Sequence, residues 1–182
     1  MKFYKQEIID LVKAWVIISL IFAIAQGFTK ENIIVSAVAV GLGFVCHELA
    51  HKMMAQKYGL HAYFQSFDKA LFISFVLSIF GIIFIAPGAV MVPHMNDAVR
   101  AGRISAAGPI VNILLALAFL AANFVYPMQM LVFGAYINAF LALFNLIPFF
   151  MFDGRKIRMW NKTIHTILLI IAAILVFAIS MI

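Results

Sequence analysis

Residues 40–54 read VGLGFVCHELAHKMM, and they place two histidines and a glutamate inside an otherwise apolar run. On a helix, His47 and His51 lie one turn apart on the same face, so both imidazoles can bind one metal ion. Glu48 follows the first histidine, where a carboxylate can take a proton from a metal-bound water. Ionisable side chains are costly in lipid and usually mark function there, so this stretch predicts a metal centre within a membrane.

The composition of the whole chain indicates an integral membrane protein. Of its 182 residues, 66% are hydrophobic and 11% are charged, and the mean hydropathy is +1.10. Apolar segments take up nearly the whole length, which predicts a single integral-membrane domain over residues 1–182. The net charge of +6 comes from basic residues spread thinly between apolar runs, so we expect them to orient the chain in the bilayer and expect no nucleic-acid binding.

Six apolar segments each approach the ~20 residues that a helix needs to cross the hydrocarbon. They run over residues 14–28, 33–55, 70–93, 104–122, 128–147 and 163–182. The first also resembles a signal peptide, but the membrane segments after it favour an uncleaved span. The single cysteine, Cys46, excludes an internal disulfide, and we expect it to be a small core residue.

The basic residues decide between two topologies. If all six segments cross once, the thirteen Lys and Arg residues divide six against seven between the two faces. If segment 70–93 enters and returns on the same side, twelve fall on one face and Lys30 alone on the other. The positive-inside tendency favours the second arrangement. Gly81 and Pro87-Gly88 are natural turning points for such a return, which requires that protein shelters the backbone.

We therefore expect a mainly α fold, a polytopic membrane helical bundle of five to six transmembrane segments. It would contain a re-entrant helix/β-hairpin element around 70–93, with a full crossing of that segment as the alternative. The N-terminus and the metal centre would lie toward the cytoplasmic side.

A catalytic zinc site usually has three protein ligands, and Asp153 is the best candidate for the third. It lies at the end of an apolar span, after Pro148, which should break the helix, and before Gly154, which allows a turn. Taken alone, an ion pair of Asp153 with Arg155 or Arg158 is equally plausible. The re-entrant topology brings Asp153 to the same side as the HExxH residues, which favours the ligand role.

Three ordered motifs resemble those of the site-2 protease family of intramembrane zinc metalloproteases. His47-Glu48-Leu49-Ala50-His51 matches the HExxH of that family, and residues 105–112 (SAAGPIVN) match its G-P-x-x-N helix start. Residues 145–154 (NLIPFFMFDG) resemble its N-x-x-P…DG segment, with phenylalanines where proline and leucine are frequent. The resemblance covers about residues 33–158 and implies a minimal prokaryotic member without a PDZ or CBS domain.

The resemblance implies that His47, His51 and Asp153 bind one Zn²⁺ ion per chain and that Glu48 is the catalytic base. The substrates would be transmembrane proteins of the same bilayer, cut in or near their membrane segments. Pro87 and Gly88 would belong to a strand that receives an unwound substrate. His₂Asp ligation favours zinc, with iron and cobalt as alternatives.

Asn112 and Asn145 are candidate donors to the oxyanion that forms when a peptide bond is attacked. Interhelical hydrogen bonding is an equally good interpretation of both residues. Two other functions compete with proteolysis: a non-proteolytic metal-binding membrane protein of the same fold, and a metal or ion transporter. The chain shows no internal repeat of the kind that many transporters contain.

Overall fold

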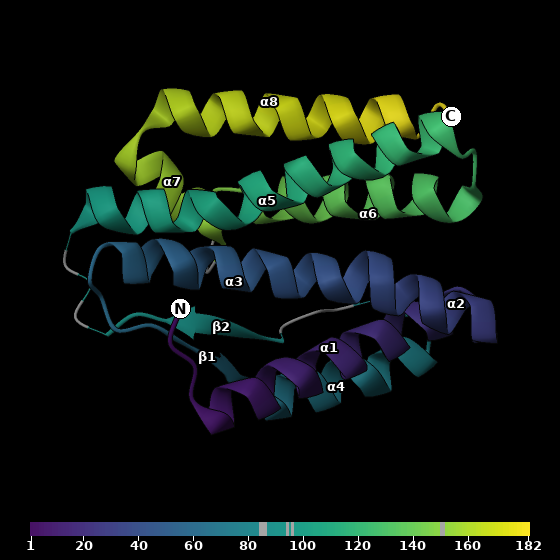
Figure 1. Cartoon of the computed structure of the whole chain (residues 1–182), viewed down its shortest axis with the longest axis horizontal. Coiled ribbons are helices and arrows are strands. Elements are labelled where there is room, and N and C mark those ends of the chain that lie inside the picture. Colours follow the sequence, from purple (N-terminus) through teal and green to yellow (C-terminus); the bar gives the residue numbers. More distant parts are fainter. Residues whose placement is uncertain (84–86, 94, 96, 150–151) are drawn as a thin grey trace.

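The computed structural model describes residues 1–83, 87–93, 95, 97–149 and 152–182, and these are mainly helical (Figure 1). The elements in chain order are α1 (Lys5–Ala25), α2 (Lys30–Val35), η1 (Ser36–Gly41), α3 (Leu42–Lys57), β1 (Tyr63–Ser66), α4 (Asp68–Ile79), β2 (Gly88–Met91), α5 (Ala98–Val125), α6 (Gln129–Asn145), α7 (Asp153–Trp160) and α8 (Lys162–Ile179). The prediction of a mainly α helical bundle is confirmed.

Within the described residues, four helical stretches are long and apolar enough to cross a membrane. They are Lys5–Ala25, Lys30–Lys57, Ala98–Val125 and Lys162–Ile179. The apolar helix α6 has 17 residues and is slightly shorter. Four of these five helices extend beyond the predicted segments at one or both ends. Helix α1 differs most, since it begins at Lys5 and therefore carries Glu7 and Asp10 within its first two turns.

The helix that carries the HExxH residues changes its winding just before them. In η1 the hydrogen bonds run from residue i+5 to residue i, as in the bond from the Leu42 N–H to the Ala37 carbonyl. Two side chains from other helices add hydrogen bonds to carbonyls of this turn: Trp15 Nε1 donates to Ala37 O (3.0 Å) and Asn138 Nδ2 to Ala39 O (2.9 Å). Such π-turns often lie next to functional sites, and here one precedes α3.

Strands β1 and β2 pair in antiparallel fashion, with Tyr63 opposite Met91 and Ser66 opposite Gly88. The chain between them therefore leaves and returns to the same place, through α4 and a turn at Gly81 (φ +78°). Gly88 has φ +147°, and a Cβ atom there would clash with the carbonyl oxygen of Gln65, so only glycine fits. Of the expected extended run around 82–92, residues 84–86 lie outside the described residues.

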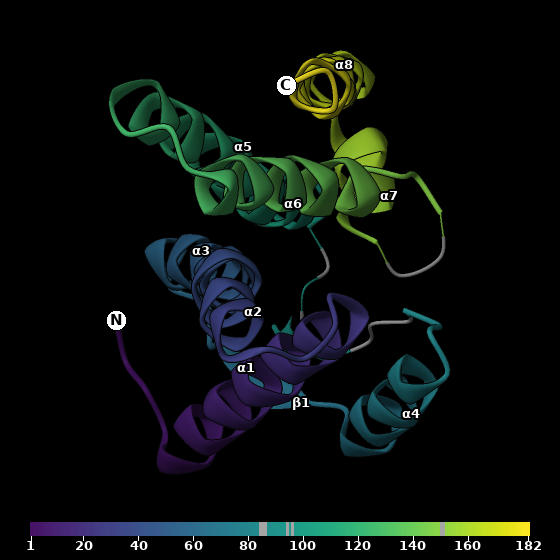
Figure 2. The ribbon, with the colours of Figure 1, turned by 90° about the vertical axis from the view of Figure 1, so that its right-hand side faces the viewer.

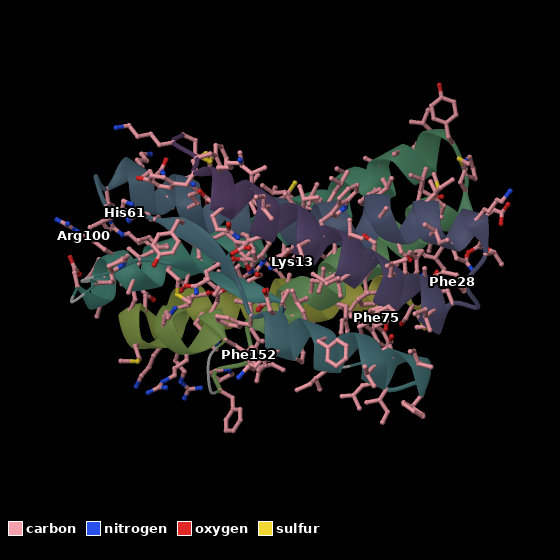
Figure 3. The ribbon with its side chains drawn as sticks, turned by 90° about the horizontal axis from the view of Figure 1, so that it is seen from below. Lys13, Phe28, His61, Phe75, Arg100 and Phe152 are labelled. Carbon is pink, nitrogen blue, oxygen red and sulfur yellow. The ribbon has the colours of Figure 1, made fainter. Side chains whose placement is uncertain are left out.

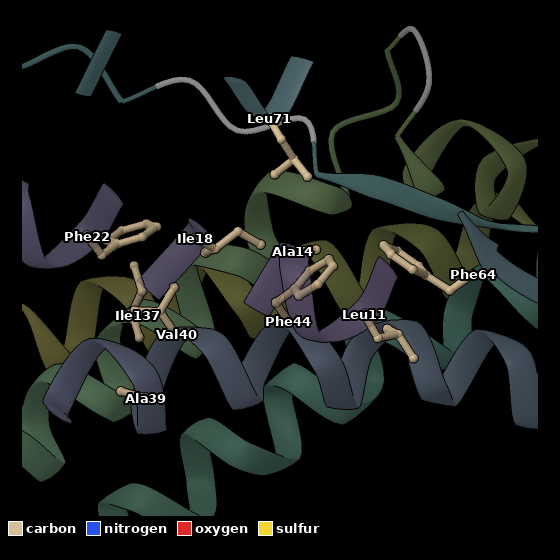
Figure 4. Packing of buried hydrophobic residues seen from close by; sticks show 10 residues of the cluster. All are labelled: Leu11, Ala14, Ile18, Phe22, Ala39, Val40, Phe44, Phe64, Leu71 and Ile137. Atoms are coloured by element: carbon tan, nitrogen blue, oxygen red, sulfur yellow. The ribbon is translucent and has the colours of Figure 1, made fainter. Parts of the chain in front are cut away.

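Helix α3 lies between two groups of elements (Figures 1 and 2). On one side are α1, α4 and the two strands; on the other are α5 to α8. The first group packs around Leu11, Ile18 and Phe22 of α1, which recur at helical spacing and form one cluster with Phe44 of α3 and Phe64 of β1 (Figure 4). The second group packs around a separate cluster that includes Ile113, Leu146 and Ile157.

The two ends of the bundle differ in the loops that they carry. In Figure 3, His61 and Arg100 lie at one end, and Phe28, in the turn between α1 and α2, lies at the other. Lys30 begins α2 beside Phe28. This separation of Lys30 from Arg100 along the bundle is the one that the charge argument required.

Candidate metal centre

His47 and His51 lie on one face of α3, and both side chains are buried. Their Nε2 atoms are 3.0 Å apart, and their rings stand at 90° to each other. Spacing of i and i+4 on a regular helix produces this approach, as the HExxH pattern predicted.

A hydrogen bond at Nδ1 fixes each imidazole. His47 Nδ1 lies 2.6 Å from Asn112 Oδ1, and His51 Nδ1 lies 2.8 Å from the Ile104 carbonyl oxygen; both partners are on α5. A carbonyl oxygen only accepts, so each Nδ1 carries the hydrogen and each Nε2 keeps a lone pair. This is the tautomer that a metal-binding histidine needs.

Asp153 completes a triangle of possible ligand atoms. Its Oδ2 atom lies 3.2 Å from His47 Nε2 and 3.0 Å from His51 Nε2, and its side chain is 13% exposed. Ligands of a tetrahedral zinc ion lie roughly 3.4 Å apart, given metal–ligand distances of about 2.1 Å. The three atoms are therefore close to the spacing that zinc requires, and together they form a group that could hold a metal ion.

Asp153 reaches the histidines because helix α6 ends well before it. Helix α6 stops at Asn145, ahead of Pro148, and Asp153 begins the separate short helix α7. Gly154 lies within α7, not in the turn that the sequence suggested. Residues 150 and 151 of the second motif lie outside the described residues. Burial alone raises the pKa of Asp153, but the two imidazoles outweigh it and hold that pKa below its usual value, which favours the ionised carboxylate.

Gly108 on α5 makes room for the two imidazoles. A Cβ atom at this position would lie 2.5 Å from His51 Cε1 and 2.6 Å from His47 Nε2. Any side chain here would displace the rings, so the glycine of the G-P-x-x-N motif has a steric reason at this site.

Glu48 is buried beside the two histidines, with 8% of its surface exposed. Its Oε2 atom accepts a hydrogen bond from the backbone N–H of Val90 on β2 (3.1 Å). The carboxylate thus lies between the candidate metal ligands of α3 and one edge of the sheet, where it can exchange protons with a group bound to either.

The two asparagines proposed as oxyanion donors have other partners in this arrangement. Asn112 donates to Gly43 O (3.2 Å) and to Asn138 Oδ1 (3.0 Å), besides accepting from His47. Asn145 donates to Leu141 O (2.9 Å) one turn earlier on α6. Asn112 therefore orients a histidine and links helices, in keeping with the interhelical interpretation.

Pro87 and Gly88 belong to the sheet. The Pro87 carbonyl accepts from the Phe67 N–H (3.0 Å), and Gly88 begins β2 opposite Ser66. Both residues are thus on the segment whose strand contacts Glu48, although neither is recorded in contact with the metal-ligand triangle.

Sequence reasoning missed three buried polar residues near the site. Asn138, fully buried on α6, joins Asn112 to η1, and Lys52 on α3 forms a buried ion pair with Glu7 on α1. A lysine directly after an HExxH histidine in an apolar run was a visible signal, but its partner is 45 residues away. No local pattern identifies a partner at that distance.

Comparison with curated proteins finds a relative in Methanocaldococcus jannaschii, described as "Putative zinc metalloprotease MJ0611". The two sequences are 39% identical over 178 residues, which span 91% of this chain and 90% of the relative. No family profile matches the chain, and no solved structure matches it.

Proposed function

The chain belongs to the zinc metalloprotease family of its archaeal relative, and we propose that it is an intramembrane protease of the site-2 type. It would hydrolyse peptide bonds in or near the transmembrane segments of other membrane proteins. The observation that carries this proposal is the convergence of His47, His51 and Asp153 from two helices of an apolar bundle, with Glu48 beside them.

The three ligand atoms fit zinc, which is the cofactor that the family uses. Zinc bound by His47, His51 and Asp153 supplies a Lewis acid that polarises a carbonyl and brings the pKa of water to about 7. Asn112 and the Ile104 carbonyl hold the two imidazoles in the ligating tautomer. Glu48 accepts a proton from the attacking water and delivers it to the leaving amine.

The β2 strand is the proposed seat for the substrate backbone. Phe64 and Ser66 turn their N–H groups away from β2, toward α1, so they are the non-bonded pairs of the antiparallel ladder. Their partners Val90 and Gly88 therefore turn their backbone groups away from β1, on the side of Glu48. A substrate segment that has unwound from its helix can pair with these groups by β-strand addition.

We keep Asn145 as the proposed oxyanion donor, because Asn112 already donates to two other groups. Asn145 ends α6 and is partly exposed, and its Nδ2 would exchange the Leu141 carbonyl for the oxyanion. A neutral amide that donates to the developing charge contributes only in the transition state. Asn145→Ala should then lower kcat more than it changes KM.

The proposed topology has five crossing helices, a re-entrant α4–β2 element and a cytoplasmic N-terminus. The antiparallel pairing of Tyr63 with Met91 supports it, because the intervening chain returns to its starting side. Water then reaches the metal from the cytoplasmic side of a prokaryotic cell membrane. The substrates would be transmembrane proteins in contact with the same lipid.

The proposal is tested by peptide cleavage in proteoliposomes. Transmembrane peptides are offered beside soluble peptides with the same flanking sequences, and products are mapped by mass spectrometry. We expect cuts in or beside the apolar segments, no cuts in the soluble peptides, and none by Glu48→Gln. A non-proteolytic relative would cleave no peptide, and a transporter would instead move metal into the vesicles in a Glu48-dependent manner.

A further inference from the structure

Lys52 and Glu7 form an ion pair in the interior of the protein. Lys52, the residue after His51, is 0% exposed, and Glu7 on α1 is 2% exposed. Both carboxylate oxygens of Glu7 contact the Lys52 ammonium, which also lies 4.2 Å from the centre of the Phe3 ring. A buried ion pair stabilises a fold no better than apolar side chains of the same volume, so its presence invites another explanation.

The same carboxylate holds strand β1. Glu7 Oε1 accepts a hydrogen bond from the Phe64 N–H (3.0 Å), which points away from β2. Glu7 Oε2 accepts in addition from the Tyr4 N–H (3.3 Å). Glu7 thus joins three elements at one point: α1, α3 and the outer edge of β1.

These contacts close a ring that returns to α3 one turn from where it began. From Lys52 the ring passes through Glu7 to Phe64 on β1, and from Phe64 to its register partner Val90 on β2. The Val90 N–H then donates to Glu48, which lies four residues before Lys52 on the same helix face. The sheet is therefore held to α3 at both edges, by Lys52 through Glu7 at one and by Glu48 at the other.

We infer that Glu7 and Lys52 are positioning residues, which hold the β1–β2 sheet at a fixed height against Glu48. This inference rests on the proposed function, in which β2 receives the substrate and Glu48 transfers protons. Neither residue contacts the ligand atoms of the metal site in this structure. Their loss should thus disturb the alignment of β2 with Glu48 and leave metal binding intact.

The test uses the double variant Glu7→Gln/Lys52→Met in the full-length protein. Removing one partner would leave a buried unpaired charge, which is strongly destabilising, whereas removing both avoids this. The introduced glutamine still offers an oxygen to the Phe64 N–H, and the introduced methionine fills the space of the lysine stem, so only the link between the sheet and α3 is lost. The control is Asp68→Asn, which removes an exposed partner of Lys13 with no recorded contact to α3.

Three quantities are measured: bound zinc, hydrogen exchange of the peptide that contains Val90, and the separate kcat and KM for peptide cleavage. The double variant should keep wild-type zinc, exchange the Val90 segment about tenfold faster, and lose about tenfold in kcat with KM within about twofold. The control should match the wild type in all three. If the double variant binds zinc and also matches the wild type in exchange and kcat, the inference is overturned.

A second variant keeps the test decisive if the double variant does not fold. Glu7→Asp retains the paired charge but shortens the side chain by one methylene, so one carboxylate can no longer reach both Lys52 and the Phe64 N–H. Faster exchange at Val90 with zinc retained supports the inference, and unchanged exchange overturns it. Faster exchange in a protein whose wild type cleaves no peptide supports positioning and contradicts the proposed function instead.

Discussion

Asn112 Oδ1 lies 2.6 Å from Nδ1 of His47, so an asparagine on α5 fixes the first candidate ligand on α3. Asn112→Ala should weaken zinc binding by about 10–100-fold, because the imidazole loses the partner that sets its tautomer and orientation. Competition with a chromophoric chelator measures the affinity. Asn123→Ala on the same helix, where the side chain accepts from the Met128 N–H far from the site, should bind zinc as the wild type does. Equal affinities in both variants would refute the orienting role.

Gly108→Ala should fold and lose zinc. The substitution favours the helix by about 1 kcal/mol, but its Cβ would lie 2.5–2.6 Å from atoms of both imidazoles. Gly134→Ala on α6 is the matched control, since its Cβ would contact only the Phe119 ring among its nearest neighbours. Metal analysis of purified, folded protein should show zinc in the control and little in Gly108→Ala. Full zinc occupancy in both would contradict the close packing of α5 against the site.

Zinc removal should lower the thermal midpoint of the protein, because the ligands join α3 to α7. A ligand that binds the native state alone stabilises it by about 4 kcal/mol when its free concentration is a thousandfold above Kd. Asp153→Asn should abolish this zinc-dependent increase, with the midpoint of the metal-free protein little changed. An increase of wild-type size in Asp153→Asn would exclude Asp153 as a ligand.

Gly88→Ala should abolish cleavage and retain zinc, because a Cβ at this position would meet the backbone of Gln65 and Ser66 and displace β2. Gly59→Ala is a control for backbone strain. Gly59 also has positive φ (+72°), but its Cβ would have no heavy atom within 4 Å apart from its own neighbours. Peptide cleavage and zinc content are measured in parallel, and near wild-type activity of Gly88→Ala would argue against a role for β2.

The re-entrant topology predicts that Lys69→Cys and Arg100→Cys react from the same side of the membrane. Both positions are exposed, and they flank the segment that leaves and returns at the sheet. In a Cys46→Ala background, a membrane-impermeant maleimide should label both in inside-out vesicles and label Lys30→Cys in right-side-out vesicles. Labelling of the first two from opposite sides would establish a full crossing of 70–93.

The sequence predicted the apolar helices and the HExxH face well, because both depend on local spacing along one helix. It also brought Asp153 to the histidines, through a charge count that constrained the topology. It did not predict β1, a four-residue strand whose partner β2 lies 22 residues further along the chain. The π-turn before α3 and the Glu7–Lys52 pair were missed for the same reason: contacts with other helices stabilise them.

The most direct test of the account measures cleavage and bound zinc in the same reconstituted samples of wild type and Glu48→Gln. Glu48 contacts Val90 and is not one of the three ligands, so its amide variant should keep the metal and lose only proton transfer. We predict equal zinc in both proteins, with cleavage of transmembrane peptides by the wild type alone. Cleavage by Glu48→Gln at the wild-type rate, or absence of zinc from both proteins, would contradict the account.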